Sequence, residues 1–298
     1  MAFTVQTPAA ADLPQIADEL SSWQTDPWVG HLHTGDLGWR TLLGAEGAAE
    51  DLRVWARDGS PVAIGMLDDG VLRLALDPEL VDDEVVATRI ARDLGDPRAN
   101  VFEAGEALVE ARGALALRGL LLSDGWVDDE LWTPFTLDLS NGLDSSPFEQ
   151  AGLRVERAGV DDAETWAAVH WAAFKGTPFE GAPRERFIRR WVAMTSGPLA
   201  DRAHNLIGFD RDGLPVAVTT VWTAGVDEPG LIEPMAVHPD HHGHGYGRAI
   251  TVAGADALRE SGASSANVVA ENSNPAAIAT YRAAGFTALA TVADLRRL

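Results

Sequence analysis

Three glycines at alternate positions, Gly243, Gly245 and Gly247, interrupt a histidine-rich loop late in the 298-residue chain. An apolar run that ends at Val237 precedes the loop, and an amphipathic stretch over 245–261 follows it directly. Glycine has no side chain, so successive backbone N–H groups and the start of a helix could approach one pyrophosphate. Because the same alternation suits a flexible loop without a ligand, the loop alone does not assign a site.

A second pattern follows the apolar run over 264–270. Asn274, Ala277 and Tyr281 are spaced by three and four positions, so they share one face of a helix. Asn274 is a natural cap for the start of this helix, and Gly285 ends it. The small Ala277 leaves room for a ligand chain, and the hydroxyl of Tyr281 can donate a proton. The pattern therefore predicts a ligand-facing helix with an acid near its end.

Together the two patterns resemble the GCN5-related N-acetyltransferase (GNAT) superfamily, whose members transfer the acetyl group of acetyl-CoA to an amine. The family's pyrophosphate motif, Arg/Gln-x-x-Gly-x-Gly/Ala, is matched at 242–247 except that His242 stands at the first position. The family's Asn-x-x-Ala-x-x-x-Tyr helix, followed by Gly-Phe, is matched in full as far as Phe286. The resemblance covers 152–298. Since histidine carries no permanent charge, we expect a cofactor affinity that is lower or more sensitive to pH than with arginine.

The resemblance implies acetyl-CoA as co-substrate and a role for each matched residue. Tyr281 would be the general acid for the departing thiolate, and Glu233, on the strand before the loop, would be the general base. The expected cofactor contacts are the backbone of one strand segment, the pyrophosphate loop with the residue after it, and the helix face: Met235, Ala236 and Val237; His242, Gly243, His244, Gly245, Tyr246, Gly247 and Arg248; Asn274 and Ala277.

Alternatives to these roles remain open. Tyr281 could simply pack in a core, and the base could instead be Glu228, His170 or a chain of waters. The histidines at 238, 241, 242 and 244 could suggest a metal, but two of them stand between glycines whose spacing already has an explanation, and only Asp240 could complete a ligand set. We therefore expect no metal.

The strand before the loop and the helices of the second half give two further expectations. Pro234 cannot donate to a sheet ladder, so it predicts a bulge or a splayed strand end that leaves room for the pantetheine arm. Several aromatic residues fall on the two helices that line the acceptor pocket in the family, and we expect most of them in the core: Trp166, Trp171, Phe174, Phe179 and Trp191.

An internal repeat divides the chain. The segment Arg-Asp-Gly-Ser-Pro-Val-Ala at 57–63 recurs as Arg-Asp-Gly-Leu-Pro-Val-Ala at 211–217, and each Asp-Gly predicts the turn of a β-hairpin. We predict a tandem duplication with domains at 1–148 and 152–298. The boundary would lie in 141–152, which is rich in Asn, Gly, Ser and Pro and shows no helical period.

Each half then predicts the order β–α–α–β–β–β–α–β–α–β–β. In the second half the helices are expected at 162–174, 184–195, 245–261 and 275–284, and the strands at 153–158, 203–210, 214–224, 230–237, 264–270 and twice in 286–297. This is a mixed α/β fold with helices on both faces of the sheet. The resemblance implies two tandem GNAT-like domains, each a mostly antiparallel twisted sheet, as in tandem acetyltransferases such as mycothiol synthase.

The first half resembles the family in fold only. The segment 79–87, which follows Leu76-Asp77-Pro78, lacks every glycine of the loop and carries four carboxylates where phosphates would bind. Leu121 stands at the position of Tyr281. We therefore expect a degenerate first domain that does not bind CoA in the family manner.

Charge is distributed unevenly between the halves. Residues 1–150 hold nine cations against 28 carboxylates, a net charge of −19, whereas residues 151–298 have a net charge of −3. This much negative charge argues against nucleic acid as a partner, and the acidic half is expected to favour a cationic amine beside the active site. With neither an apolar span nor a leader in the sequence, we expect a soluble, cytoplasmic protein that is not bound to a membrane.

The sequence therefore predicts an acyltransferase: an N-acetyltransferase that carries acetyl from acetyl-CoA to a primary amine of a small molecule, by direct attack in a ternary complex. A non-catalytic acyl-CoA binding or sensing protein is the alternative. A nicotinamide dehydrogenase is disfavoured, because its fingerprint is Gly-x-Gly-x-x-Gly early in a βαβ unit. The acceptor, the acyl chain length and the oligomeric state are not indicated.

Overall fold

The computed structural model describes residues 2–103, 105–144 and 146–298. The elements of the first half are, in order, β1 (Phe3–Gln6), α1 (Leu13–Ser22), α2 (Thr34–Arg40), α3 (Ala45–Glu50), β2 (Leu52–Arg57), β3 (Ser60–Asp68), β4 (Val71–Leu76), α4 (Glu84–Gly95), β5 (Ala107–Glu110), α5 (Leu115–Ser123) and β6 (Val127–Asp138). This half has a third helix, α3, before its first hairpin, which the repeat did not predict. It also ends on one long strand in place of two short ones.

The second half follows the predicted order. Its elements are β7 (Arg154–Arg157), α7 (Ala163–Lys175), α8 (Gly181–Thr195), β8 (Ala203–Phe209), β9 (Pro215–Trp222), β10 (Gly230–Val237), α9 (Tyr246–Glu260), β11 (Ser265–Glu271), α10 (Pro275–Ala283), β12 (Thr287–Ala288) and β13 (Val292–Arg297). The repeated Asp-Gly turns are confirmed as hairpins. Asp58 and Gly59 take the positive φ angles, 52° and 93°, that a two-residue hairpin turn requires, and Gly213 takes one of 80° in the β8–β9 turn.

The segment between the halves differs from the expectation. A short helix, α6 (Ser146–Ala151), forms within 141–152, where no helical period was found. Phe148 and Ala151 pack against the core of the second half, so tertiary contacts account for a helix that the composition did not predict. Ser145, also in this segment, lies outside the described residues.

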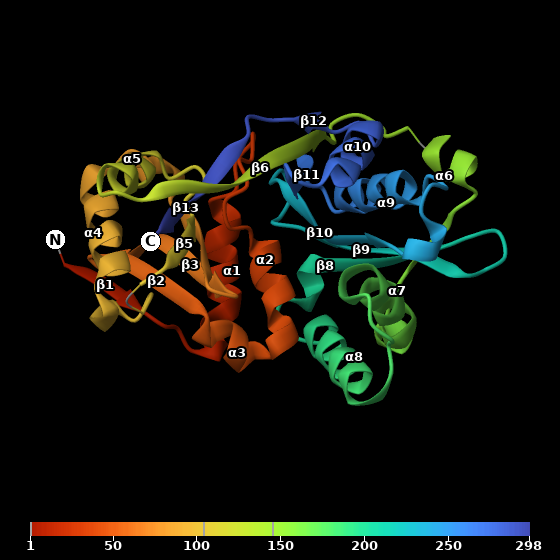
Figure 1. Ribbon diagram of the computed structural model, residues 1–298, viewed down its shortest axis with the longest axis horizontal. Coiled ribbons are helices and arrows are strands. Elements are labelled where there is room, and N and C mark those ends of the chain that lie inside the picture. Colours follow the sequence, from red (N-terminus) through yellow and green to blue (C-terminus); the bar gives the residue numbers. More distant parts are fainter. Residues whose placement is uncertain (1, 104, 145) are drawn as a thin grey trace.

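All strands join one thirteen-stranded sheet that runs through both halves (Figure 1). Its order is β1-β2-β3-β4-β5-β13-β6-β11-β10-β9-β8-β7, with β12 beside β6. Only β4–β5 and β10–β11 pair in parallel among the described strands, which confirms the mostly antiparallel mixed fold.

Two strands cross between the halves. β6 pairs with β13 through residues 127–132 and with β11 through residues 132–138. β13 also pairs with β5, so that the end of the chain lies in the sheet of the first half (Figure 1). The two strands expected in 286–297 thus form, but each pairs with β6 and not with the other. Leu295 of β13 is fully buried in the first-half core, whereas Phe135 of β6 is fully buried in the second-half core.

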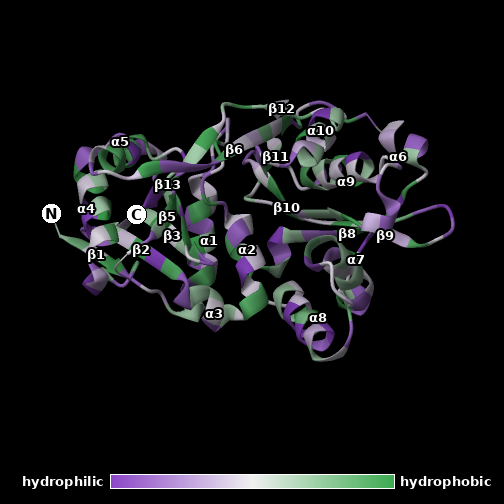
Figure 2. Ribbon diagram, viewed as in Figure 1, coloured by the Kyte–Doolittle hydropathy of each residue, from purple (hydrophilic) through white to green (hydrophobic). Residues whose placement is uncertain are grey.

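Helices cover both faces of the second-half sheet. Val221 of β9 packs with the residues of α9, and its neighbour Trp222 packs with those of α7. Because successive side chains of a strand point to opposite faces, α9 and α7 lie on opposite sides of the sheet, above and below it in Figure 1. Hydrophobic and hydrophilic residues alternate along these covering helices (Figure 2).

Helix α2 joins the first half to the second. A Cβ atom placed on Gly35 or Gly38 would come within 2.6 or 2.2 Å of the Trp222 side chain, so only glycine permits this approach. Nε2 of His33 donates a hydrogen bond of 2.9 Å to the carbonyl oxygen of Pro229 at the same junction. None of the described helices combines the length and the apolar character that crossing a bilayer requires.

Candidate active site

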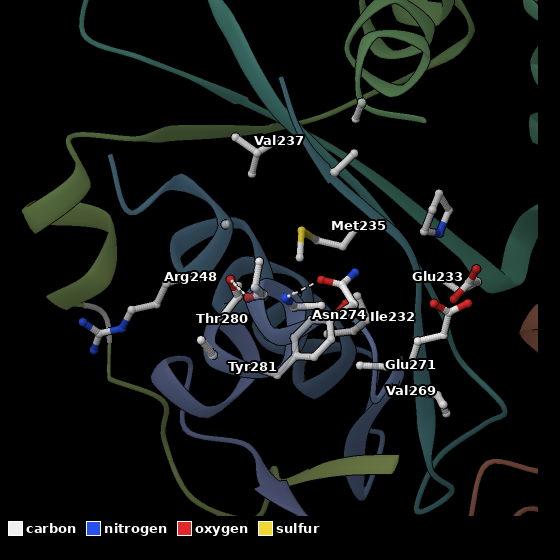
Figure 3. A pocket seen from close by; sticks show the side chains of 18 of the residues that line it. Ile232, Glu233, Met235, Val237, Arg248, Val269, Glu271, Asn274, Thr280 and Tyr281 are labelled. Carbon is white, nitrogen blue, oxygen red and sulfur yellow. Dashed lines mark hydrogen bonds between the residues drawn. The ribbon is translucent and has the colours of Figure 1, made fainter. Parts of the chain in front are cut away.

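A cavity of about 920 Å³ opens where the two halves meet. Its walls from the second half are β10, the end of β11, the loop before α9 with the first turn of that helix, α10 and the end of α7. Figure 3 shows Arg248 at one end of this cavity and Glu233 at the other, with Met235, Thr280 and Tyr281 between them. A long ligand could therefore lie with one end at the loop and the other at Glu233.

Strand β10 separates from β11 along this cavity. The two strands pair in parallel at Gly230 and Leu231, the only register positions they share within the described residues. Beyond these, β10 continues beside β9 as far as Val237, while its other edge faces the cavity. The backbone N–H and C=O groups of Met235–Val237 on that edge can accept an extended ligand chain as if it were a strand.

A bulge marks the point of separation. The register between β10 and β9 shifts between Ile232 and Met235, around Pro234, which confirms the bulge expected from this proline. Two side chains of β9 hold it: Nε1 of Trp222 donates to the carbonyl oxygen of Glu233 at 2.8 Å, and Oγ1 of Thr219 donates to that of Pro234 at 2.9 Å. These two hydrogen bonds fix the backbone at Glu233 and Pro234.

The glycine loop has the conformation that its sequence suggests. Gly243 and Gly245 have φ angles of 82° and 81°, and Gly245 directly precedes the first turn of α9. A Cβ atom on Gly247 would lie 3.2 Å from Cγ2 of Thr280, a tight approach between α9 and α10. The loop therefore presents backbone, not side chains, at the N-terminus of a fifteen-residue helix.

The polar residues of the loop lie partly inside and partly outside the cavity. His242 and Arg248 line it, and Nε2 of His242 donates to the carbonyl oxygen of Val237 at 3.1 Å. Nη1 of Arg248 donates to Oε1 of Gln150 at 3.3 Å. His244 lies outside the lining and stacks on Tyr246, with ring centroids 5.6 Å apart.

Helix α10 presents the predicted face to the cavity, where Asn274, Ala277 and Tyr281 are joined by Thr280. Oδ1 of Asn274 accepts the backbone N–H of Ala277 at 3.1 Å, so the side chain caps the helix (Figure 3). Thr280 was not expected at the site. It stands one position before Tyr281 and faces Gly247, a contact that the helix spacing alone does not reveal.

Glu233 and Tyr281 are both protonated more readily than usual. Burial raises the pKa of Glu233 to about 7, with the carboxylates of Asp36 and Glu110 adding to the rise and Arg73 opposing it. Burial also raises the pKa of the Tyr281 phenol, and the charge of Glu233 contributes in the same direction. The cavity thus combines a carboxyl group whose pKa is raised to about 7 with a phenol whose pKa is also raised.

The first half supplies the opposite wall, with residues that the sequence did not identify: Trp28, Asp36, Arg73, Glu110, Arg112 and Trp132. Nη1 of Arg73 lies 2.7 Å from Oδ1 of Asp36, and Nη2 of Arg112 lies 2.9 Å from Oδ1 of Asp294. Glu110 stands 3.5 Å from a guanidinium nitrogen of each arginine. A signal for Arg73 is visible in the sequence, since it is a lone charge within the apolar run 71–76.

The comparisons with known proteins point to one family. Residues 164–286 match the family described as "Acetyltransferase (GNAT) family". The second half of the chain thus contains a GNAT acetyltransferase domain. This confirms the family suggested by the loop and helix patterns.

Two relatives of the chain have the same name. The chain is 34% identical over 146 residues to a protein named "Mycothiol acetyltransferase" of Sanguibacter keddieii, a match that covers 45% of this chain and 43% of that relative. It is 27% identical to a protein of the same name from Clavibacter michiganensis subsp. michiganensis, over 87% of this chain and 83% of the relative.

The fold is also similar to that of a solved structure, the "Tandem GNAT protein from the clavulanic acid biosynthesis pathway (without AcCoA)". The match covers 99% of this chain and 98% of the chain in that structure, with a TM-score of 0.62 and 17% sequence identity. The tandem GNAT fold thus extends over the whole chain.

The two residues considered as alternative bases lie away from this cavity. Neither His170 nor Glu228 is among the described residues that line it. His170 is buried between the rings of Trp166 and Phe187, with centroids 5.2 and 5.1 Å away, and burial lowers its pKa to about 3. Among the aromatic residues singled out above, Phe174 lines the cavity, while Trp166 and Trp191 are fully buried.

The loop histidines do not form a metal site in the part of the chain that the structure describes, where no group of three potential ligands gathers. The rings of His238 and His241 are the nearest pair, with centroids 5.5 Å apart.

The corresponding loop of the first half has an aspartate side chain at the N-terminus of α4. Asp83 caps α4 by accepting the backbone N–H groups of Val85 and Val86 at 2.8 and 3.0 Å. Its other oxygen pairs with Nη1 of Arg57 at 2.8 Å. A carboxylate therefore occupies the helix N-terminus at the place where the second half has glycines, and Leu121 is buried in the core at the position of Tyr281.

Proposed function

We propose that this chain binds acetyl-CoA in its second half and transfers the acetyl group to a primary amine of a small molecule, by direct attack in a ternary complex. One observation carries the proposal. A single cavity holds the glycine loop, the free edge of β10 and the Asn274–Tyr281 face, and it ends at a carboxyl group whose pKa lies near neutrality.

The residues fit the cofactor along its length. A Cβ atom on Gly243 would meet nothing within 4 Å, so the loop has open space on its backbone for a pyrophosphate. Arg248 adds positive charge at this end. The free edge of Met235–Val237 suits the amides of the pantetheine arm, and Ala277 leaves space beside it. We assign no metal to the reaction.

Acetyl-CoA supplies an activated thioester, and the protein moves two protons. An amine must lose its extra proton before its nitrogen can attack, and Glu233 is the group we assign to accept that proton. The new C–N bond forms as the C–S bond breaks, and the leaving sulfur needs a proton. We assign its donation to the phenol of Tyr281, which burial keeps protonated.

We assign the halves different tasks, with residues 152–298 as the active domain and residues 1–148 as a degenerate one. The first half supplies the acceptor side of the cavity, where Asp36 and Glu110 favour a cationic amine. Because relatives of the chain are named mycothiol acetyltransferase, the amine that those enzymes acetylate is the first acceptor to test.

A thiol-release assay tests the proposal directly. The chain contains no cysteine, so a thiol reagent reports released CoA without background from the protein. We expect calorimetry to give one acetyl-CoA per chain and at least one amine of a panel to release CoA together with the acetylated product. Binding without release by any amine would favour a non-catalytic acyl-CoA binding protein instead.

A further inference from the structure

The first half places an arginine in the cavity that contains Glu233. Arg73 lies on β4 between Leu72 and Leu74, whose side chains are fully buried in the first-half core. Because side chains alternate along a strand, Arg73 points away from that core. It lines the same cavity as Glu233. The degenerate half thus contributes a cation to the acceptor end of the site.

Three carboxylates hold Arg73 in this position. The first is Asp36, whose Oδ1 lies 2.7 Å from Nη1 of Arg73. The other carboxylate oxygen of Asp36 accepts the backbone N–H of His33 at 2.7 Å. Glu110 stands directly opposite Arg73 in the β4–β5 register, with 3.5 Å between Oε1 and Nε. Asp68 is 3.7 Å from the same nitrogen. Partners on α2, β5 and β3 therefore fix one guanidinium group.

The charges that act on Glu233 have opposite effects. Asp36 of α2, Glu110 of β5 and Asp68 of β3 disfavour its carboxylate form, as does burial, whereas Arg73 of β4 favours it. The neighbouring Tyr281 of α10 carries a neutral phenol. Among these groups Arg73 supplies the positive charge, so its loss would leave a buried carboxylate facing three others.

We propose that Arg73 is a positioning residue for the site of the second half, whose positive charge keeps Glu233 in the carboxylate form that accepts the proton of the acceptor. This rests on the proposed function, because it explains how the base assigned there stays available near neutral pH. It also gives the first half a task in the reaction, although its own phosphate loop is closed.

Titration of Glu233 by NMR tests the inference without an acceptor. In protein labelled with ¹³C at the glutamate carboxyls, the Glu233 signal is assigned by its loss in Glu233→Gln. We expect Arg73→Gln to move the titration of Glu233 upward by about one pH unit or more. Arg40→Gln is the matched control: Arg40 pairs with Asp68 at 2.6 Å in the same cluster but does not line the cavity, so the titration should stay in place.

Two further variants separate charge from packing. Arg73→Lys retains the positive charge and should keep the titration near that of the wild type. Asp36→Asn removes a repelling carboxylate, while its side-chain oxygen can still accept the His33 N–H, so it should move the titration downward. Opposite shifts from Arg73→Gln and Asp36→Asn are not expected of residues that only support the fold. If Arg73→Gln does not fold, as thermal unfolding would show, the other two variants decide.

The pH profile of kcat/KM, from thiol release, provides the functional readout. The acid limb should rise with pH through about 7 in the wild type and move upward in Arg73→Gln, a loss of about tenfold at pH 6 that shrinks to less than about twofold at pH 9. An unchanged Glu233 titration in folded Arg73→Gln, or no downward shift in Asp36→Asn, would overturn the inference. The expected NMR shifts in a protein that acetylates no amine would instead overturn the proposed function.

Discussion

At the scale of single residues, the cavity contains two acids that differ in how tightly they hold their protons. Glu233 titrates near neutrality and can exchange a proton with an amine, whereas the Tyr281 phenol remains protonated over the physiological range. Glu233 lies at the end of the cavity away from Arg248, and Tyr281 lies between the two (Figure 3). In the proposed reaction, the proton acceptor would therefore lie apart from the end that binds the pyrophosphate.

Replacing Tyr281 by phenylalanine should lower turnover by roughly 10²-fold, in the range for loss of a general acid. The ring would still pack against Phe135, whose centroid is 5.6 Å away, so the fold and the affinity for acetyl-CoA should change little. Steady-state kinetics and calorimetry on the same preparation check both parts. Turnover equal to that of the wild type at neutral pH would remove Tyr281 from the mechanism.

At the scale of elements, the two halves use the same strand–loop–helix unit differently. In the second half two glycines with positive φ lead into α9, whereas in the first half the Asp83 carboxylate caps α4. A helix N-terminus attracts negative charge in both cases. In one half that charge belongs to the protein, and in the other the position is open for a ligand.

Gly245→Asp should weaken acetyl-CoA binding by about 10²-fold or more, because it combines a strained backbone with a negative charge beside the pyrophosphate. Gly213→Asp is a matched control: Gly213 has a φ of 80°, close to the 81° of Gly245, but lies in the β8–β9 turn away from the cavity. Both variants should lose similar thermal stability, and only the first should lose affinity by calorimetry. Equal affinity in the two would refute the loop assignment.

Local sequence patterns predicted most helices and strands of the second half. They also predicted the residues with which this half lines the cavity. The helix face of Asn274, Ala277 and Tyr281 could be identified because its spacing and caps are local properties of the chain. The contribution of Asp36 and Arg73 to the cavity could not be predicted from the sequence, because it depends on how α2 and β4 of one half meet β10 of the other. The crossing of β6 and β13 escaped prediction for the same reason, because both strands carry ordinary strand patterns and only tertiary packing selects their partners.

At the scale of the whole molecule, the uneven charge bears on how an acceptor arrives. The first half, with a net charge of −19, forms one wall of the cavity, while the cofactor loop belongs to the nearly neutral second half. An anionic cofactor and a cationic acceptor would then approach from surfaces suited to each.

For a cationic acceptor, kcat/KM should fall steeply as salt rises, while turnover at saturating acceptor should change little. Such steering is screened over about 10 Å at 0.1 M salt and about 3 Å at 1 M. Initial rates over a series of potassium chloride concentrations measure this. A kcat/KM that does not depend on ionic strength, or a best acceptor that is an anion, would mean that the acidity serves only solubility.

The exchange of strands between the halves also has a consequence for the order of folding. β5 needs β13 beside it, and the buried pair of Arg112 with Asp294 joins residues 182 positions apart. During synthesis the first half therefore emerges with one edge of its sheet unpaired, and its core lacks Leu295 until β13 has been made. Neither half can complete its hydrogen bonding alone, so the chain should gain and lose its native structure as one cooperative unit.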